Sequence, residues 1–133
     1  MKPTNLVEQF YNQVWNNADE KLAKEILHPE LRFRGSLGDE HSGPEGFISY
    51  MRGVHRVLGD YTCKIDVLLE DKGQVAARLT FFGTHQAEFL GVPATGREVL
   101  WAGAAFFSFA HGRIKDIWVL GDVDWIKRQL IVV

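Results

Sequence analysis

An aspartate at the end of an aromatic-rich strand is the residue of this sequence best placed to do chemistry. A strand-like run over 114–121 ends directly before Asp122. Trp118, Leu120 and Asp122 alternate along the chain and therefore share one face. On an apolar face that lines a pocket, a partly desolvated carboxylate is suited to taking up and returning a proton. Asp122 could instead cap a short helix over 125–130, and both interpretations remain open.

Two further polar residues lie where a pocket could use them. His85 begins a loop over 85–96 that we expect to lie above the pocket, although loop histidines are also often exposed or bonded to backbone. Arg34 lies two positions after Arg32 on a short strand, so both point to one face, opposite Phe33. Arg34 is interpreted either as solvent-facing or as an anchor for a substrate carboxylate, phenolate or enolate.

Aromatic side chains supply the candidate substrate contacts. The chain contains four tryptophans, three tyrosines and nine phenylalanines. Most aromatic residues at helical or strand spacing pack in the core, and Tyr11 is assigned there. In a domain this small, however, a pocket wall is one of the few places that can accommodate so many rings. We therefore expect a flat apolar or aromatic ligand to contact Trp15, Tyr50, Trp101 and Trp118.

Composition indicates one globular domain over 1–133. The 46% of hydrophobic and 24% of charged residues are typical of such domains. The formal charge of −2 gives no reason to expect nucleic acid or a membrane surface as a partner. No apolar run reaches the roughly 18 residues of a membrane span, and no signal-peptide pattern begins the chain, so we expect a cytoplasmic protein. Cys63 is the single cysteine and no histidine pair has ligand spacing with a nearby carboxylate, so no metal is expected.

The apolar periodicity predicts the elements that position these residues. Three N-terminal helices are expected, the first capped by Thr4, the second by Asp19 and the third opened by Pro44. The period then changes from about 3.6 to 2. The alternating segments are 61–69, 75–81, 99–109 and 114–121, with tight turns predicted at 71–73 and 110–113. This order indicates an α+β fold: a curved antiparallel sheet with three N-terminal helices packed on its concave side, forming a cone around a pocket.

Several motifs together resemble a known family. They are Gly43-Pro44-Glu45-Gly46-Phe47, Gly83-Thr84-His85, 90–96, 107–114, Trp118, Asp122 and Arg128-Gln129-Leu130. In this order and spacing, over nearly the whole chain, they resemble the SnoaL-like polyketide cyclases. These belong to the cone-shaped superfamily of nuclear transport factor, ketosteroid isomerase and scytalone dehydratase. The resemblance implies a cofactor-free intramolecular aldol cyclisation by an acid/base aspartate, at the position of Asp122.

Two positions depart from the family pattern and favour an alternative. The family commonly has a histidine where this chain has Ile117, and many members have an acid where it has Ala105. The alternative is a non-catalytic ligand-binding or dimerisation module of the same fold. Ketosteroid isomerase chemistry is rejected because Arg34 and Ala105 stand where its two acids would be. Limonene-type epoxide hydrolysis is rejected because the chain has no Arg-x-Asp triplet.

The last predicted strand pair also suggests an assembly. The run 99–109 is apolar on both faces, whereas the helices can cover only one side of the sheet. A second apolar surface remains to be buried. We therefore predict a homodimer packed sheet to sheet.

Overall fold

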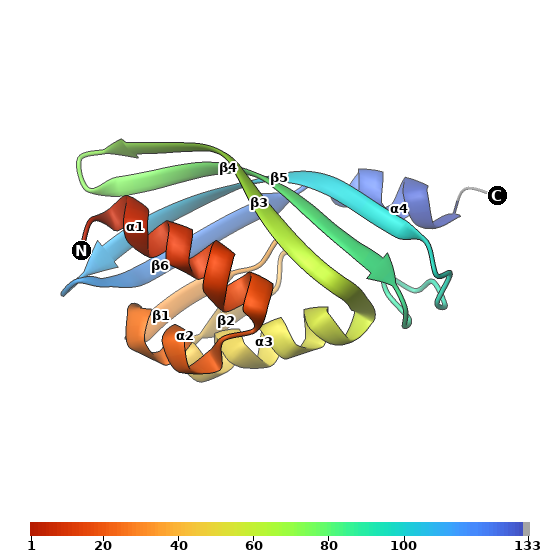
Figure 1. Ribbon diagram of the computed structural model, residues 1–133, viewed down its shortest axis with the longest axis horizontal. Coiled ribbons are helices and arrows are strands. Elements are labelled where there is room, and N and C mark those ends of the chain that lie inside the picture. The colour runs from red at the N-terminus through yellow and green to blue at the C-terminus, as the bar shows by residue number, and fades with distance from the viewer. Residues whose placement is uncertain (132–133) are drawn as a thin grey trace.

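A curved, open, six-stranded sheet with helices on one side forms the fold of the computed structural model, which describes residues 1–131 (Figure 1). The elements in chain order are α1 (Pro3–Gln9), η1 (Phe10–Trp15), α2 (Glu20–Ile26), β1 (Leu27–Arg34), β2 (Glu40–Ser42), α3 (Gly43–Val57), β3 (Leu58–Asp71), β4 (Gln74–His85), β5 (Glu98–Ala110), β6 (Arg113–Gly121) and α4 (Val123–Ile131). In Figure 1, α1, α2 and α3 lie together on one side of the sheet and α4 lies at its far end. The predicted α+β cone fold is confirmed.

The sheet is antiparallel except at one pair of strands. Its strand order is β2-β1-β6-β5-β4-β3, and β1 runs parallel to β6. The prediction of a wholly antiparallel sheet was therefore wrong at this pair. The two strands are distant in the sequence, and parallel neighbours need such a long crossover, which alternation within each strand does not reveal.

Two hairpins build the long central part of the sheet with the same kind of turn. Lys72 and Gly73 join β3 to β4, with φ of 52° and 78°. His111 and Gly112 join β5 to β6, with φ of 53° and 73°. Two consecutive left-handed residues match the right-handed twist of the flanking strands, which explains the glycine at each second position. Both predicted turns are confirmed.

The helix caps differ from the prediction at one end. The first helix begins at Pro3 after Lys2, without a side-chain cap, so the assignment of Thr4 as its cap was wrong. Proline is well suited to this position because it lacks the N–H that a cap would satisfy. Asp19 does cap α2, since its carboxylate accepts a hydrogen bond from Leu22 N at 3.0 Å. Over η1 the helix widens into a π-helix.

Side-chain amides cover two open strand edges. Asn16, just after η1, donates from Nδ2 to Cys63 O at 3.0 Å and accepts at Oδ1 from Cys63 N at 2.8 Å. Gln129 on α4 likewise donates from Nε2 to Leu100 O of β5 at 2.7 Å and accepts at Oε1 from Leu100 N at 3.0 Å. β3 is the edge strand, and β6 ends before it can pair with the start of β5. Each amide thus replaces a missing neighbouring strand.

Replacing Asn16 with alanine should lower the free energy of unfolding by about 1–3 kcal/mol, because it leaves the Cys63 N–H and C=O without partners. The measurement is urea unfolding followed by tryptophan fluorescence. Asn17→Ala is the matched control, because Asn17 is exposed. Equal midpoints for the two variants would show that the edge groups of β3 do not depend on Asn16.

The outer face of β5 and β6 exposes large apolar side chains. Leu100, Phe106, Trp118 and Leu120 are 49%, 53%, 43% and 52% exposed. The Phe106 and Trp118 rings lie 5.9 Å apart across the two strands. This is the second apolar surface that the sequence predicts, and the sheet-to-sheet homodimer remains a prediction.

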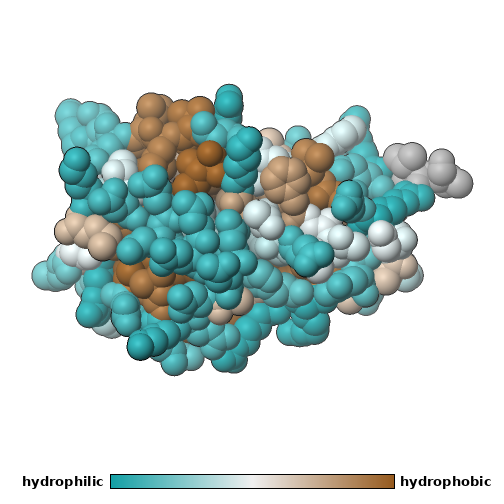
Figure 2. All heavy atoms as spheres, viewed as in Figure 1, coloured by the Kyte–Doolittle hydropathy of each residue, from teal (hydrophilic) through white to brown (hydrophobic). Residues whose placement is uncertain are grey.

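The side of the molecule that carries α1–α3 has a different surface. Figure 2 shows it as mainly hydrophilic, with a few separate apolar groups. Within residues 1–131, none of the helices combines the length and the hydropathy needed to cross a membrane. The apolar side chains of α1–α3 instead face the sheet.

Candidate functional site

A small cavity lies between the helices and the inner face of the sheet. Its volume is about 20 Å³, enough for about one water molecule. Nine segments of the chain contribute to its wall. The lining residues are Tyr11, Trp15, Phe33, Ser36, Leu37, Tyr50, Val54, Leu58, Tyr61, Phe81, Phe89, Trp101 and Val119.

Strand alternation and the wide turn of η1 bring the aromatic wall together. Phe81 and Trp101 face inward from neighbouring strands and stack, with centroids 5.2 Å apart at 28°. Trp15 comes from η1 and packs against Tyr61, with centroids 5.2 Å apart. Flat rings therefore enclose the space on several sides, which suits a flat ligand.

Two hydrogen-bond donors in this wall have no partner among the residues that the structure describes. Tyr11 Oη and Trp101 Nε1 are buried and unpaired, and each residue is 2% exposed. Burial raises the pKa of Tyr11 well above its ordinary value, so its phenol stays protonated and able to donate. Burial of a polar group without a partner is unfavourable by about 1–3 kcal/mol. A ligand oxygen or a water that accepts from either donor would satisfy it.

Two glycines let the turn after β1 close over the end of the cavity. A Cβ at Gly35 would lie 2.5 Å from Tyr50 Oη. A Cβ at Gly121 would lie 2.8 Å from Ser36 Cβ and 3.2 Å from Trp101 Nε1. Burial also raises the pKa of Tyr50, which keeps a second phenol protonated here. The sequence analysis missed both glycines, since nothing local indicates these close approaches.

The cavity wall offers donors but no conventional base. None of the described lining residues carries a carboxylate, an imidazole or a positive charge. Within residues 1–131, no group of three or more His, Cys, Asp or Glu side chains is placed to hold a metal ion. The arrangement can therefore bind and polarise an oxygen atom, using neutral donors in a dry, aromatic surrounding.

The structure brings together three of the seven predicted site residues. Trp15, Tyr50 and Trp101 line the cavity. The other four, Asp122, His85, Arg34 and Trp118, do not line it. The sequence analysis also missed Tyr11 as a cavity residue, because aromatic residues at helical spacing usually only pack in the core. The widening of the helix at η1 was not visible in the sequence.

Asp122 lies in solvent at a helix end. Its Oδ1 accepts a hydrogen bond from Trp125 N at 3.1 Å, which makes it the N-cap of α4. On β6, Ile117 and Val119 are buried, whereas Trp118 and Leu120 are exposed. Alternation thus predicted correctly which residues share a face, but the inference that this face is the pocket was wrong. Alternation alone cannot say which face the helices cover.

Arg34 and Trp118 lie together on the outer side of the sheet. The Arg34 guanidinium lies 4.9 Å from the centre of the Trp118 ring, and it donates a hydrogen bond to Val119 O. Phe33 points to the opposite side and lines the cavity. The predicted opposition of Phe33 and Arg34 is therefore confirmed, and Arg34 faces away from the cavity.

His85 is the last residue of β4 and is fully buried. It adjoins two lining residues without lining the cavity itself. It is the strand partner of Leu58 on the neighbouring β3, and its ring centroid is 6.4 Å from that of Phe89. Its Nδ1 contacts Thr95, and its Nε2 has no partner. The catalytic assignment of His85 remains a prediction.

Because asparagine caps helices as well as aspartate, we expect Asp122→Asn to leave both the stability and any turnover nearly unchanged. Asp122→Ala should lower the free energy of unfolding by about 1 kcal/mol. Urea unfolding and product formation measure the two effects, with the exposed Asp124→Ala as control. A fall in turnover of about 10²–10⁴-fold in the asparagine variant, at unchanged stability, would contradict this and assign Asp122 the acid/base role.

Comparison with known families adds a finding to this geometry. A family model described as SnoaL-like polyketide cyclase matches residues 5–130. Among curated proteins, the aklanonic acid methyl ester cyclase DnrD of Streptomyces peucetius is 25% identical over 107 residues, which cover 78% of this chain and 74% of the relative.

Solved structures agree with this match. IdmH, a putative polyketide cyclase from Streptomyces antibioticus, is 25% identical with a TM-score of 0.87, over 99% of this chain and 100% of that one. TsrD from Streptomyces laurentii is 27% identical with a TM-score of 0.84, over 97% and 94% of the two chains. Both similarities extend over nearly the whole chain.

Proposed function

Because this chain belongs to the SnoaL-like polyketide cyclase family, we propose that its cavity binds a small, flat carbonyl compound and promotes an intramolecular aldol ring closure. The observation that supports this most is the pair of unpartnered donors, Tyr11 Oη and Trp101 Nε1, in an aromatic cavity. Both donors are uncharged, so the ligand atom that suits them is a carbonyl, enol or enolate oxygen.

The proposed reaction moves one proton and forms one bond. A C–H next to a carbonyl loses its proton to solvent water, because no described lining side chain can take it. The resulting enolate carbon attacks a second carbonyl carbon of the same molecule. The proton ends on the new alkoxide, so no oxidant or reductant is needed. The conjugated substrate and the donors of Tyr11 and Trp101 would share the enolate charge, which is the usual role of an oxyanion hole. The reaction written in this way needs no cofactor.

The substrate is proposed by class only. The names of DnrD and of DauD from Streptomyces sp. (strain C5) state that those proteins cyclise aklanonic acid methyl ester. At 25% and 26% identity, these names support a carbonyl-bearing polycyclic or aromatic compound for this chain. The aromatic wall supports the same class.

A second candidate is ligand binding without turnover. One specific observation favours it: the described lining residues include no carboxylate and no imidazole that could take the proton. In this case the same donors would hold a ligand oxygen. Ile117 and Ala105, in place of the family's usual histidine and acid, would then be expected, because no proton transfer is needed. Both positions are buried and apolar.

Calorimetry with two matched ligands tests the site. We expect 1-tetralone, a bicyclic ketone, to bind up to about tenfold more tightly than tetralin, which lacks the oxygen, because one hydrogen bond is worth up to about 1.5 kcal/mol. Equal affinities would contradict the role of the donors. Ring closure of 1-phenylhexane-1,5-dione, followed by chromatography, tests the chemistry. Ketone binding without ring closure would decide for the binding-only candidate.

A further inference from the structure

The cavity is too small for the ligand that its wall suits. Its volume is about 20 Å³, whereas pockets for small molecules usually measure about 300–1,000 Å³. The space shown holds about one water molecule, so a bicyclic ligand can enter only if part of the wall moves. The part of the wall that is held least firmly is the part expected to move.

The segment 86–97, between β4 and β5, is the least attached part of the wall. Its tip closes on itself through two backbone hydrogen bonds between Phe89 and Val92, at 3.0 Å and 2.9 Å. Within the described part of the chain, residues 87–94 make no hydrogen bond with residues outside the segment. A Cβ at Gly91 would meet nothing within 4 Å, so the tip residue itself is clear of the body. Leu90 and Val92 beside it pack against the core through partly buried apolar side chains only.

Both ends of the segment are anchored at the end of β4. His85 N donates to Arg97 O at 2.8 Å, and Gly96 N donates to His85 O at 2.8 Å. Gln86 N donates to Val57 O at 3.0 Å. The segment thus has hydrogen-bonded ends and a tip that makes no hydrogen bond with the rest of the described chain. This is the geometry of a hinged flap.

Phe89 is the residue through which this segment closes the cavity. It is 8% exposed and lines the cavity, although the tip that carries it is otherwise on the surface. Among the lining residues, the others come from helices, from strands, or from the turn at Ser36, whose carbonyl accepts from Gly121 N. Outward movement of the tip would remove one ring from the wall and leave the rest in place.

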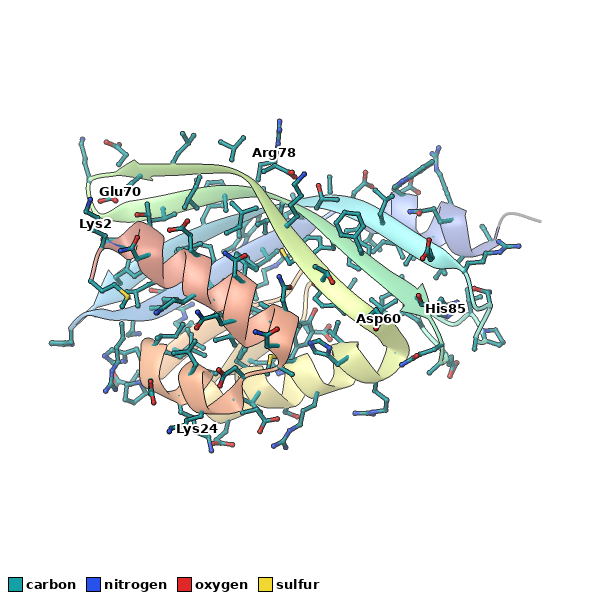
Figure 3. The ribbon with its side chains drawn as sticks, in the orientation of Figure 1. Lys2, Lys24, Asp60, Glu70, Arg78 and His85 are labelled. Atoms are coloured by element: carbon teal, nitrogen blue, oxygen red, sulfur yellow. The ribbon has the colours of Figure 1, made fainter. Side chains whose placement is uncertain are left out.

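The side-chain contact between His85 and Thr95 holds the segment down. His85 Nδ1 lies 3.3 Å from Thr95 N and 2.9 Å from Thr95 Oγ1. Because a backbone N–H can only donate, Nδ1 is the acceptor and the ring proton lies on Nε2. His85 is fully buried at the end of β4, where the segment begins (Figure 3), whereas Thr95 is on the surface. A surface side chain bonded to a buried ring can be released without disturbing the core.

We propose that residues 86–97 form a flap that opens to admit the ligand, with Phe89 as the gate that limits ligand size and Thr95 as the latch on His85. The ligand part of this inference rests on the proposed function, whereas the latch does not. His85 then acts as a positioning residue for Phe89.

Hydrogen exchange of the free protein tests the latch without any ligand. Thr95→Val removes the hydroxyl but keeps the size, so it removes the contact with His85 Nδ1 and the hydrogen bond that Arg97 N donates to Oγ1 at 3.2 Å. It should speed exchange of amides 87–94 about 2- to 10-fold. Exchange in β5 should not change. Thr84→Val, one residue before His85, is the matched control and should change exchange neither of amides 87–94 nor of β5. Equal exchange in the two variants, or faster exchange throughout β4 and β5, would overturn the latch.

Binding kinetics test the gate. Stopped-flow quenching of tryptophan fluorescence by 1-tetralone should show association about 2- to 10-fold faster in Thr95→Val, because the open form is more populated. Phe89→Ala should also associate faster and should bind the tricyclic ketone anthrone at least tenfold more tightly than the wild type. Unchanged association in Phe89→Ala overturns the gate. If the wild type binds neither ketone, the proposed function and the gate fail together, while the exchange result still decides the latch.

Discussion

Replacing Tyr11 with phenylalanine should slow ring closure by about 10²–10³-fold while leaving the protein as stable as the wild type or up to about 3 kcal/mol more stable. The two effects have opposite directions because the Tyr11 hydroxyl is buried without a partner. In the free protein this hydroxyl is unfavourable, and only a bound oxygen would make it useful. Most substitutions of buried residues lower both stability and activity.

The measurements are the rate of ring closure of 1-phenylhexane-1,5-dione and urea unfolding. Tyr50→Phe is the matched control, because the Tyr50 hydroxyl already has partners in Ser36 and Leu37. Its loss should reduce stability by about 1 kcal/mol and affect the rate less. For the binding-only candidate, the affinity for 1-tetralone should fall about tenfold and that for tetralin should not change. A stable Tyr11→Phe protein with unchanged rate and affinity would remove the support for both candidates.

Replacing Phe106 with aspartate should convert the expected homodimer to a monomer at micromolar concentration. Phe106 is 53% exposed, and its ring packs on Trp118 in the middle of the apolar outer face of β5 and β6. Truncation of a central aromatic residue weakens an interface by about 2–4 kcal/mol, a factor of roughly 30 to 1,000 in the dissociation constant, and a buried charge weakens it further.

Sedimentation velocity measures this change. Trp125→Asp is the control, because Trp125 is 47% exposed and lies on α4 rather than on a strand of the sheet. We expect the control to remain dimeric. A wild-type protein that sediments as a monomer at micromolar concentration would show that the outer face is not a dimer interface. Dissociation of the control as well would show that the interface is elsewhere.

The sequence predicted elements and turns well because their signals are local. The change of apolar period at the end of α3, the two glycine-bearing hairpin turns and the Asp19 cap are each determined by a few neighbouring residues. The family resemblance is also confirmed, since it depends on the order of short motifs along the chain. These features follow from backbone conformation and spacing, which the sequence contains directly.

The site was predicted in part, because its residues come from distant segments. Trp15, Tyr50 and Trp101 were expected at the cavity and line it. The donor role of Tyr11 required its hydroxyl to be seen without a partner, and pairing is a property of the whole fold. No local pattern separates a buried aromatic residue that only packs from one that also borders a cavity.

Only the tertiary structure decided which side of each element is inside. The sequence by itself determined that Trp118 and Leu120 share a face, because side chains alternate along every strand. The position of the helices then decided that this face is outside and that Val119 lines the cavity. The amide of Asn16 on the β3 edge and the contact of Thr95 with His85 likewise needed the folded chain. Local steric rules act between neighbours in sequence, whereas burial and hydrogen-bond partners are set by neighbours in space.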